Sequence, residues 1–404
     1  MMSLDDILDH EVVRLQRFIE NRRFSFLERL SHSKAALLVI AAMVVVFQMR
    51  NLPEQLANSS LDAAIAVERL TPPKSVRLVV IDDDDYKGLF HARSPLEADV
   101  LANVLAAVAA GSPKAIVVDL DTSDDSFLSM PVPDVATVWN AGGEELEDGR
   151  FRVDAPLGGR KLAADSMTAL AIAPRDDRGI VRGYQHSYVL KSGGTVDSPG
   201  FAAATLAAGH APEDAASHPG RIHYLDYHYR FAPIKVRDLL EDARASSWQS
   251  LGLFKNQVVV VGGAYRAARD QYATPRGLMD GSAIIAQAAE AEIDRTTISP
   301  ASRWLTGLLL IAGGLVTLTV YHCFKFRTAF LISLGLVPVL SMASNGILFH
   351  RFAAWGAMVP LVIAVIIAEL YSKAALYLAF YQKVVDLKSK DSHEMRAEQA
   401  HSSH

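Results

Sequence analysis

The chain has little cysteine, no basic surplus and, through its middle, no long apolar run. Its 404 residues include a single cysteine, Cys323, which excludes internal disulfides and any metal site built only from cysteines. Forty Lys and Arg against 45 Asp and Glu give a net charge of −5, which argues against a nucleic-acid-binding protein. Residues 51–302 contain no apolar run of membrane-spanning length, so we expect this segment to be a globular domain.

Four apolar segments flank that domain. The first is Ala35–Met49, and three more follow in quick succession: Leu305–Phe324, Ala329–Phe349 and Trp355–Tyr377. Each of the last three is about twenty residues long, the length of a membrane span. Half of the chain is hydrophobic and its mean hydropathy is +0.16, which is high for a soluble protein. We therefore expect one transmembrane helix over residues 35–50 and three within residues 303–380.

Basic residues near the ends of these segments predict the orientation. They gather before the first segment, between the second and third, and after the fourth: Arg14, Arg17, Arg22, Arg23, Arg29, Lys34, Lys325, Arg327, Lys383, Lys388, Lys390 and Arg396. We therefore expect a multi-pass protein of the bacterial inner membrane with both termini in the cytoplasm. Residues 51–302 would then lie on the extracytoplasmic side.

The two predicted cytoplasmic ends are short. Apolar residues recur at helical spacing from Leu4 to Ile19, which predicts an amphipathic helix within residues 1–34 that contacts lipid or a partner. Residues 381–404 form a polar tail that is too small for a catalytic core. Small residues in the second apolar segment, such as Gly313 and Gly314, favour close helix contacts. Besides the lipid bilayer, we expect a homo-oligomer or other membrane or cytoplasmic subunits as partners, and no nucleic acid.

Helices and strands alternate in residues 51–302. We expect helices over residues 60–68, 95–110 and 281–294, and buried strands over residues 76–81, 115–118, 135–139 and 258–261. Residues 180–190 and 221–230 also alternate like strands, Ser94 is a candidate helix cap, and Asp148-Gly149 predicts a turn between short strands. The predicted fold is an α/β extracytoplasmic domain, with a mainly parallel sheet flanked by helices, plus four transmembrane α-helices.

Charged residues follow three of the expected strands, at the ends where parallel sheets bind ligands. The predicted ligand-binding residues are Asp82, Asp84, Asp119, Asp121, Arg266, Arg269 and Asp270. We expect the five carboxylates of this set to share one pocket-sized region. Clustered carboxylates can hold a cation or act as acid and base, but an Asp after a strand can equally cap the next helix or turn.

Catalytic and metal-binding interpretations of these residues are weaker. The acidic runs lack the spacing of a calcium loop, and His223 and Asp226 lie in a strand-like segment without further ligands at facing positions. We therefore predict no catalytic residue and no metal site, and we assign no cofactor.

The motifs of the middle segment, taken in order, resemble those of one family. They are SVRLVVIDDDDY, GSPKAIVVDLD, DDRGIVRGYQHSYVL, RIHYLDYHYRFAPIKVRDLLED and FKNQVVVVGGAYRAARDQYATPRGLMDGSAIIAQAAEAEI. Set between one span and three, they resemble the CHASE2 family of bacterial extracytoplasmic sensor domains over about Leu52–Arg295. The matching positions are Asp119, Asp177, Gly179, Arg182, Gly262, Asp270, Thr274, Pro275, Gly281 and Ala286.

The resemblance implies that the chain senses an outside cue and transmits it through the membrane. In the family the output is commonly a nucleotide cyclase, a histidine kinase or a protein kinase, and no motif of these follows Tyr381. We therefore expect a sensor or regulatory subunit that acts through separate membrane or cytoplasmic partners and is not an enzyme. The alternative is a structural or accessory subunit of a larger membrane assembly that uses the CHASE2-like domain as an interaction module.

Overall fold

The computed structural model of the chain describes residues 54–209, 222–225, 227–245 and 252–300, with a few isolated positions between 304 and 355. The predicted amphipathic helix, the four predicted spans (those isolated positions aside) and the C-terminal tail lie outside the described residues. Among the helices of the described part, none has the length and apolarity that crossing a membrane requires. The chain divides into two compact units, and the described elements mostly build the unit of Ser59–Pro300 with Leu348–Trp355.

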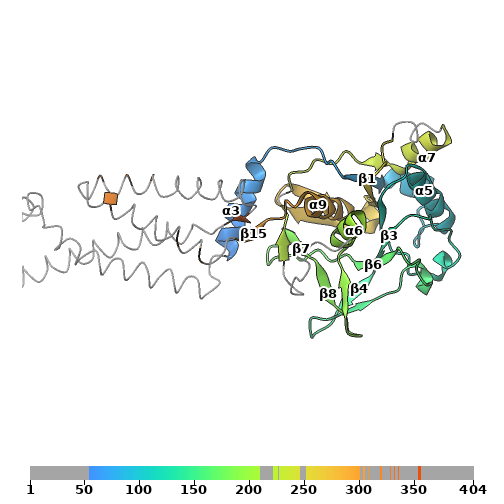
Figure 1. Ribbon diagram of the computed structural model, residues 1–404, viewed down its shortest axis with the longest axis horizontal. Helices are drawn as coiled ribbons and strands as arrows, with labels where there is room; N and C mark the ends of the chain where they lie inside the picture. The colour runs from blue at the N-terminus through green and yellow to red at the C-terminus, as the bar shows by residue number, and fades with distance from the viewer. Residues whose placement is uncertain are drawn as a thin grey trace, which may run out of the picture. The chain divides into compact units, whose positions relative to one another are not determined.

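An eight-stranded sheet forms the centre of this unit (Figure 1). Its strands are, in spatial order, β11 (Ile234–Lys235), β1 (Val76–Ile81), β12 (Val258–Gly263), β2 (Ala115–Asp119), β3 (Thr137–Ala141), β6 (Met167–Leu170), β9 (Thr195–Asp197) and β8 (Ser187–Val189). All pairs are parallel except β8 with β9. The predicted α/β fold with a mainly parallel sheet is confirmed.

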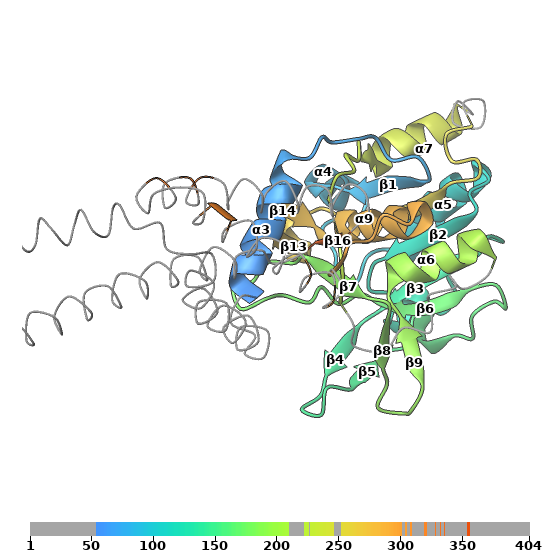
Figure 2. The ribbon, with the colours of Figure 1, turned by 60° about the vertical axis from the view of Figure 1, so that its left-hand side comes forward.

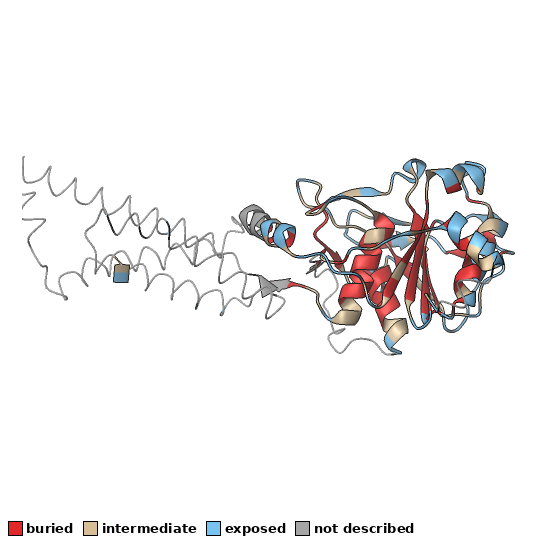
Figure 3. Ribbon diagram, turned by 90° about the horizontal axis from the view of Figure 1, so that it is seen from above, coloured by how far each residue is buried: buried red, intermediate tan, exposed pale blue. Residues whose placement is uncertain are grey.

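Helices cover both faces of the sheet (Figure 2). One face packs on α5 (Ala98–Ala110) and α7 (Val236–Arg244), and the other packs on α6 (Pro199–Ala208) and α9 (Gly281–Asp294). Side chains along a strand point alternately to the two faces of the sheet, so alternate residues of β1 belong to the apolar cores on the two faces. Both faces are therefore buried, as the continuous apolar strands predict (Figure 3).

The remaining elements lie around this core. The helices are α3 (Glu54–Val67) and α4 (Asp83–Gly88), and the strands are β4 (Gly143–Glu145), β5 (Phe151–Val153), β7 (Gly183–Gln185), β10 (Ile222–Tyr224), β13 (Gln271–Thr274), β14 (Gly277–Asp280), β15 (Ser299–Pro300) and β16 (Ala354–Trp355). The short strands pair as β4–β5, β7–β10, β13–β14 and β15–β16. Asp148-Gly149 forms the turn of the β4–β5 hairpin, as predicted.

Three local predictions are wrong in part. Helix α5 begins at Ala98 after Glu97 and not after Ser94, because Leu96 is buried in the core before the helix begins. Residues 180–190 form two strands, which are separated at His186, whose ring is buried and bonded to α9. Residues 221–230 contain a strand only at β10, since Tyr227 has a positive φ of 53°, which interrupts an extended strand.

Candidate functional site

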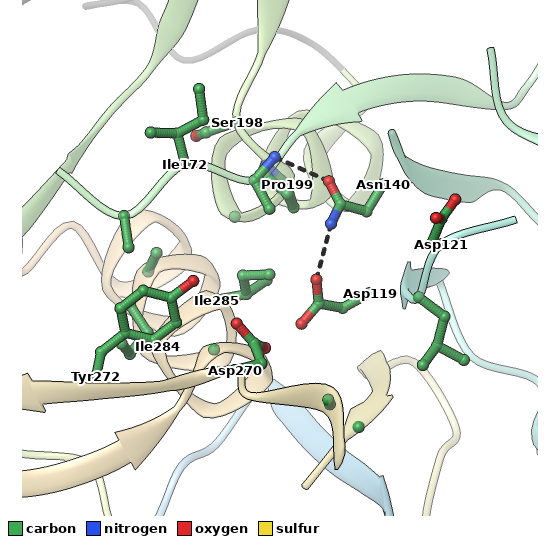
Figure 4. A pocket seen from close by; sticks show the side chains of 18 of the residues that line it. Asp119, Asp121, Asn140, Ile172, Ser198, Pro199, Asp270, Tyr272, Ile284 and Ile285 are labelled. Atoms are coloured by element: carbon green, nitrogen blue, oxygen red, sulfur yellow. Dashed lines mark hydrogen bonds between the residues drawn. The ribbon is translucent and has the colours of Figure 1, made fainter. Parts of the chain in front are cut away.

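A cavity of about 410 Å³ lies where the carboxyl ends of β12, β2 and β3 approach the N-termini of α6 and α9 (Figure 4). Its wall contains three carboxylates, Asp119, Asp121 and Asp270, and four tyrosines, Tyr86, Tyr184, Tyr265 and Tyr272. Apolar side chains such as Ile284 and Ile285 complete it. No Lys, Arg or His is among the described residues that line it. The cavity is therefore acidic and aromatic, in the position where parallel sheets bind ligands.

Asp119 is the centre of the polar network in this cavity. Its Oδ1 accepts a hydrogen bond of 2.9 Å from Nδ2 of Asn140, and Oδ1 of Asn140 accepts one of 2.8 Å from the N–H of Ala171. Because a backbone N–H can only donate, the contact with Ala171 fixes the orientation of the Asn140 amide. The other Asp119 oxygen, Oδ2, is buried and has no hydrogen-bond partner within the described ranges. The cavity thus holds a carboxylate oxygen that is fixed in place but unsatisfied.

The two buried carboxylates influence each other. Burial and, to a smaller extent, the negative charge of Asp270 raise the pKa of Asp119 to about 7, against the hydrogen bond from Asn140, which lowers it. Burial also raises the pKa of Asp270, against a hydrogen bond from Tyr272. Both carboxylates point into the same space (Figure 4). Such a pair favours a shared proton or a cation between its members.

Helix α9 contacts the base of the cavity through its first turn. A Cβ on Gly281 would lie 2.2 Å from Oδ2 of Asp270, so only glycine leaves room for this carboxylate. A Cβ on Gly262 of β12 would lie 2.4 Å from Cβ of Ser282, which explains the close contact of strand and helix. Glycine at both positions therefore lets α9 approach the acidic pair.

Gly200 brings α6 against α9 at the same wall. A Cβ there would lie 2.6 Å from Cβ of Ala288 and 3.0 Å from the backbone nitrogen of Ala289, so the two helices would have to separate. We expect Gly200→Ala to lower the free energy of unfolding by roughly 1–3 kcal/mol, the cost of overpacking a core. The control Ala208→Ser, at the exposed end of the same helix, should change it by less than about 0.5 kcal/mol. Equal effects in thermal unfolding would contradict this explanation.

The structure brings three of the seven predicted ligand-binding residues to the cavity and leaves four outside its wall. Asp119, Asp121 and Asp270 line it, and Asp82, Asp84, Arg266 and Arg269 do not. Asp82 shares the carboxyl edge of the sheet with Asp119, but β12 lies between their strands. The predicted convergence of all five carboxylates in one pocket is therefore wrong for Asp82 and Asp84.

Asp82 caps a helix, which is the alternative that the sequence left open for an Asp after a strand. Its Oδ1 caps α4 by accepting the N–H groups of Asp84 at 3.0 Å and Asp85 at 2.8 Å, and its Oδ2 pairs with Lys235 at 3.0 Å. Burial by itself would raise the pKa of Asp82, but the Asp85 N–H and Lys235 outweigh it, so this pKa is lowered. A carboxylate satisfied in this way is not available to a ligand.

The two predicted arginines lie on the loop after β12. The N–H of Arg266 donates to Oδ1 of Asp83 at 2.9 Å, while its side chain is 93% exposed. Arg269 ends the short 3₁₀ turn of Arg266–Ala268 with a left-handed φ of 53°. The loop places Asp270, the next residue, in the wall.

Sequence reasoning missed Asn140, Ser198 and the four tyrosines. Asn140 had a signal, because an amide interrupts the otherwise apolar segment of β3. Ser198 had a weaker one, as a serine before Pro199 is typical of a helix start. The tyrosines come from three separate segments, and nothing in their spacing indicates that they share a wall.

A second polar cluster lies beside the cavity. Nε2 of His186 is 2.7 Å from Oε1 of Glu292 on α9, and the hydroxyl of Tyr184 donates to the same oxygen. The His186 ring stacks on Phe201 and on His223 at centroid distances of 4.3 and 3.5 Å. Because Tyr184 also lines the cavity, this cluster connects the wall to the later turns of α9.

The fold is an α/β domain with a cavity at the carboxyl edge of a parallel sheet. The CHASE2 domain family model matches residues 37–319, and the chain therefore belongs to the CHASE2 family, which confirms the resemblance in its motifs. CHASE2 domains are sensory domains of the extracytoplasmic type. No curated protein and no solved structure matches the chain. Within the described ranges, no group of three or more His, Cys, Asp or Glu is placed to hold a metal ion.

Proposed function

We propose that this protein is a membrane-anchored sensor or regulatory subunit that binds a small ligand in the cavity beside Asp119. Its CHASE2 domain lies on the extracytoplasmic side, and it acts through separate membrane or cytoplasmic partners. The observation that carries the ligand-binding role is the buried, unpaired Oδ2 of Asp119. A buried oxygen without a partner costs free energy, and a ligand that donates a hydrogen bond to it in the cavity would remove that cost.

Helix α9 offers a direct route from the cavity toward the second predicted span. Its first residue, Gly281, lies against Asp270, and its last, Asp294, precedes residues 303–380 by a short link. Near its C-terminal end, Glu290 accepts the N–H groups of Lys74, Ser75 and Val76, which join it to the start of β1. A ligand that shifts the first turn of α9 would therefore move a rigid helix rather than a loop.

The β13–β14 hairpin offers a second route, toward the first predicted span. Asp270 and Tyr272 at one end line the cavity, and Arg276 at its turn donates to the carbonyls of Ala66 at 3.2 Å and Glu68 at 2.8 Å. These carbonyls belong to the C-terminal end of α3, which follows the predicted span at residues 35–50. The wall of the cavity thus includes residues of two elements, one leading toward the first predicted span and one toward the second.

Thiol labelling in intact cells tests the orientation. In a Cys323→Ser background, Glu147→Cys places a thiol on the exposed β4–β5 hairpin, and the matched control Ser389→Cys places one in the C-terminal tail. We expect a membrane-impermeant reagent to label the first from outside and the second only after permeabilisation, because the basic residues hold the tail in the cytoplasm. The reverse pattern would contradict the proposed orientation.

A further inference from the structure

We infer that the ligand of this cavity is a small organic cation whose ammonium or amidinium group lies between Asp119 and Asp270. This assignment rests on the ligand-binding role proposed above and adds the chemical class. It follows from the charge of the wall, from its unsatisfied oxygens and from its aromatic and apolar surface.

Charge is the first argument. The carboxylates of Asp119 and Asp270 point into one space, and no Lys, Arg or His is among the described residues of the wall (Figure 4). Arg175 lies outside the wall, 4.9 Å from the centroid of the Tyr272 ring, and lowers the pKa of Asp270 by less than burial raises it. The backbone N–H of Gly281, at the start of α9, favours the ionised form of Asp270 and opposes the rise of its pKa that burial causes. A cationic group placed between two such carboxylates gains charge-assisted hydrogen bonds to both.

Unsatisfied polar atoms are the second argument. Oδ2 of Asp119 is buried without a partner, and so is Oγ of Ser198, whose residue is only 4% exposed and lines the same cavity (Figure 4). An ammonium group donates three hydrogen bonds and an amidinium group at least as many. Both ligand groups can therefore satisfy several acceptors at once and, unlike a neutral or anionic group, also balance the negative charge of the carboxylates.

The rest of the wall distinguishes an organic cation from a metal ion. Tyr86 and Tyr265 stack at 4.2 Å in the wall, and aromatic rings favour organic ammonium groups. Ile172, Ile284 and Ile285 offer apolar contacts to a hydrocarbon body, which a hydrated ion lacks. Ca²⁺ and Mg²⁺ require about six or more oxygen ligands, and the described residues supply no cluster of three metal-ligating side chains. The volume of about 410 Å³ suits a small molecule.

Calorimetric titration of the purified full-length protein tests the assignment. The cationic probes are n-butylammonium, 1,4-diaminobutane and acetamidinium, the neutral and anionic counterparts are 1-butanol and butyrate, and CaCl₂ and MgCl₂ are the metal probes. We expect at least one organic cation to bind and the other three classes not to. Asp119→Asn should weaken that binding by roughly 10- to 100-fold, the effect of losing a charged hydrogen bond. Asp84→Asn, exposed at the same edge but outside the wall, is the matched control and should leave it unchanged.

The pH dependence supplies a readout that a structural role of Asp119 would not give. The charged or titratable groups around Asp119 are Asp121 after β2, Tyr86 of α4, Tyr184 of β7, and Asp270, Tyr265 and Tyr272 from the segment after β12, with Arg175 and Asp280 close to Asp270. A cation prefers the ionised carboxylate, so binding should tighten between pH 6 and 8 and release a proton, since the pKa of Asp119 lies near 7. The binding heat should then vary with the ionisation enthalpy of the buffer.

The other possible results of the titration distinguish a failure of the cationic class from a failure of ligand binding in the cavity. Binding of 1-butanol or butyrate but of no cation would overturn the cationic class and leave a ligand-binding cavity. Binding of CaCl₂ or MgCl₂ in the cavity, lost in Asp119→Asn, would replace the organic cation by a metal ion. If no probe of any charge binds, both the cation and the proposed ligand-binding role fail. Unchanged affinity in Asp119→Asn, with Asp270→Asn also unchanged, would overturn the location.

Discussion

Asp119→Asn is expected to stabilise the ligand-free protein at pH 8. The pKa of Asp119 is about 7 in the folded protein and 3.8 without burial, and three pKa units correspond to about 4 kcal/mol. The asparagine can still accept the hydrogen bond from Asn140, and its amide can donate toward Asp270. It therefore removes the cost of a buried charge and keeps the network, for a net gain of roughly 1–4 kcal/mol in the free energy of unfolding.

The sign of the pH dependence makes this prediction specific. Below about pH 4 both folded and unfolded wild-type chains hold the Asp119 proton, so the charge costs nothing. As pH rises from about 4 to 7 the unfolded chain ionises first, and the wild type loses stability relative to the variant. Thermal unfolding of the full-length wild type and variant from pH 4 to pH 8 should show a gap that widens and then stays constant above pH 7. Asp84→Asn, at an exposed position, should show no such trend, and a narrowing gap for Asp119→Asn would contradict the prediction.

Arg182→Ala is expected to have the largest destabilising effect in the domain. The Arg182 side chain is 4% exposed and makes two hydrogen bonds of 2.8 Å to Asp62 and a third to Asp176. Alanine would leave two carboxylates, 26% and 18% exposed, without their cation, so we expect a cost of about 2–4 kcal/mol, between that of an exposed pair and that of a fully buried one. The control Arg152→Ala removes the exposed pair with Glu144 at 3.3 Å and should cost at most about 1 kcal/mol.

The same variant should loosen α3 in particular. Asp62 lies on α3, while Arg182 and Asp176 lie in the segment around β7, so this ion pair joins the helix that follows the first predicted span to the rest of the domain. Hydrogen exchange of the full-length protein should show faster exchange in Glu54–Val67 for Arg182→Ala and no change for Arg152→Ala. Equal protection in the two variants would mean that the apolar contacts of Leu61 and Ile65 hold α3 without the arginine.

Much of the fold was predictable because its strands are buried on both faces. A strand that is buried on both faces is a continuous apolar run and does not alternate between apolar and polar residues. The structure places β1 and β12 at two such runs, VRLVVI and VVVV. Helix α9 was predicted to the residue, since Gly281 and Asp294 bound an alanine-rich segment. The break at His186 was not predictable, because a buried contact with Glu292 on a distant helix decides it.

The composition and the local patterns of this chain determined its class: an α/β domain with a parallel sheet, acidic residues after its strands, and the motif order of the CHASE2 family. Only the tertiary structure decided which acidic residue lines the cavity. Asp82 directly follows a buried apolar strand and Asp119 ends another, and nothing in the local sequence distinguishes the two positions. The insertion of the late strand β12 between β1 and β2 sets Asp119 opposite Gly262, beside Asn140 and near Asp270, while Asp82 meets Lys235 and the start of α4. The order of the strands brings together residues that are far apart in the chain. At Asp82 these neighbours bond both carboxylate oxygens, whereas at Asp119 they leave Oδ2 without a hydrogen-bond partner among the described residues.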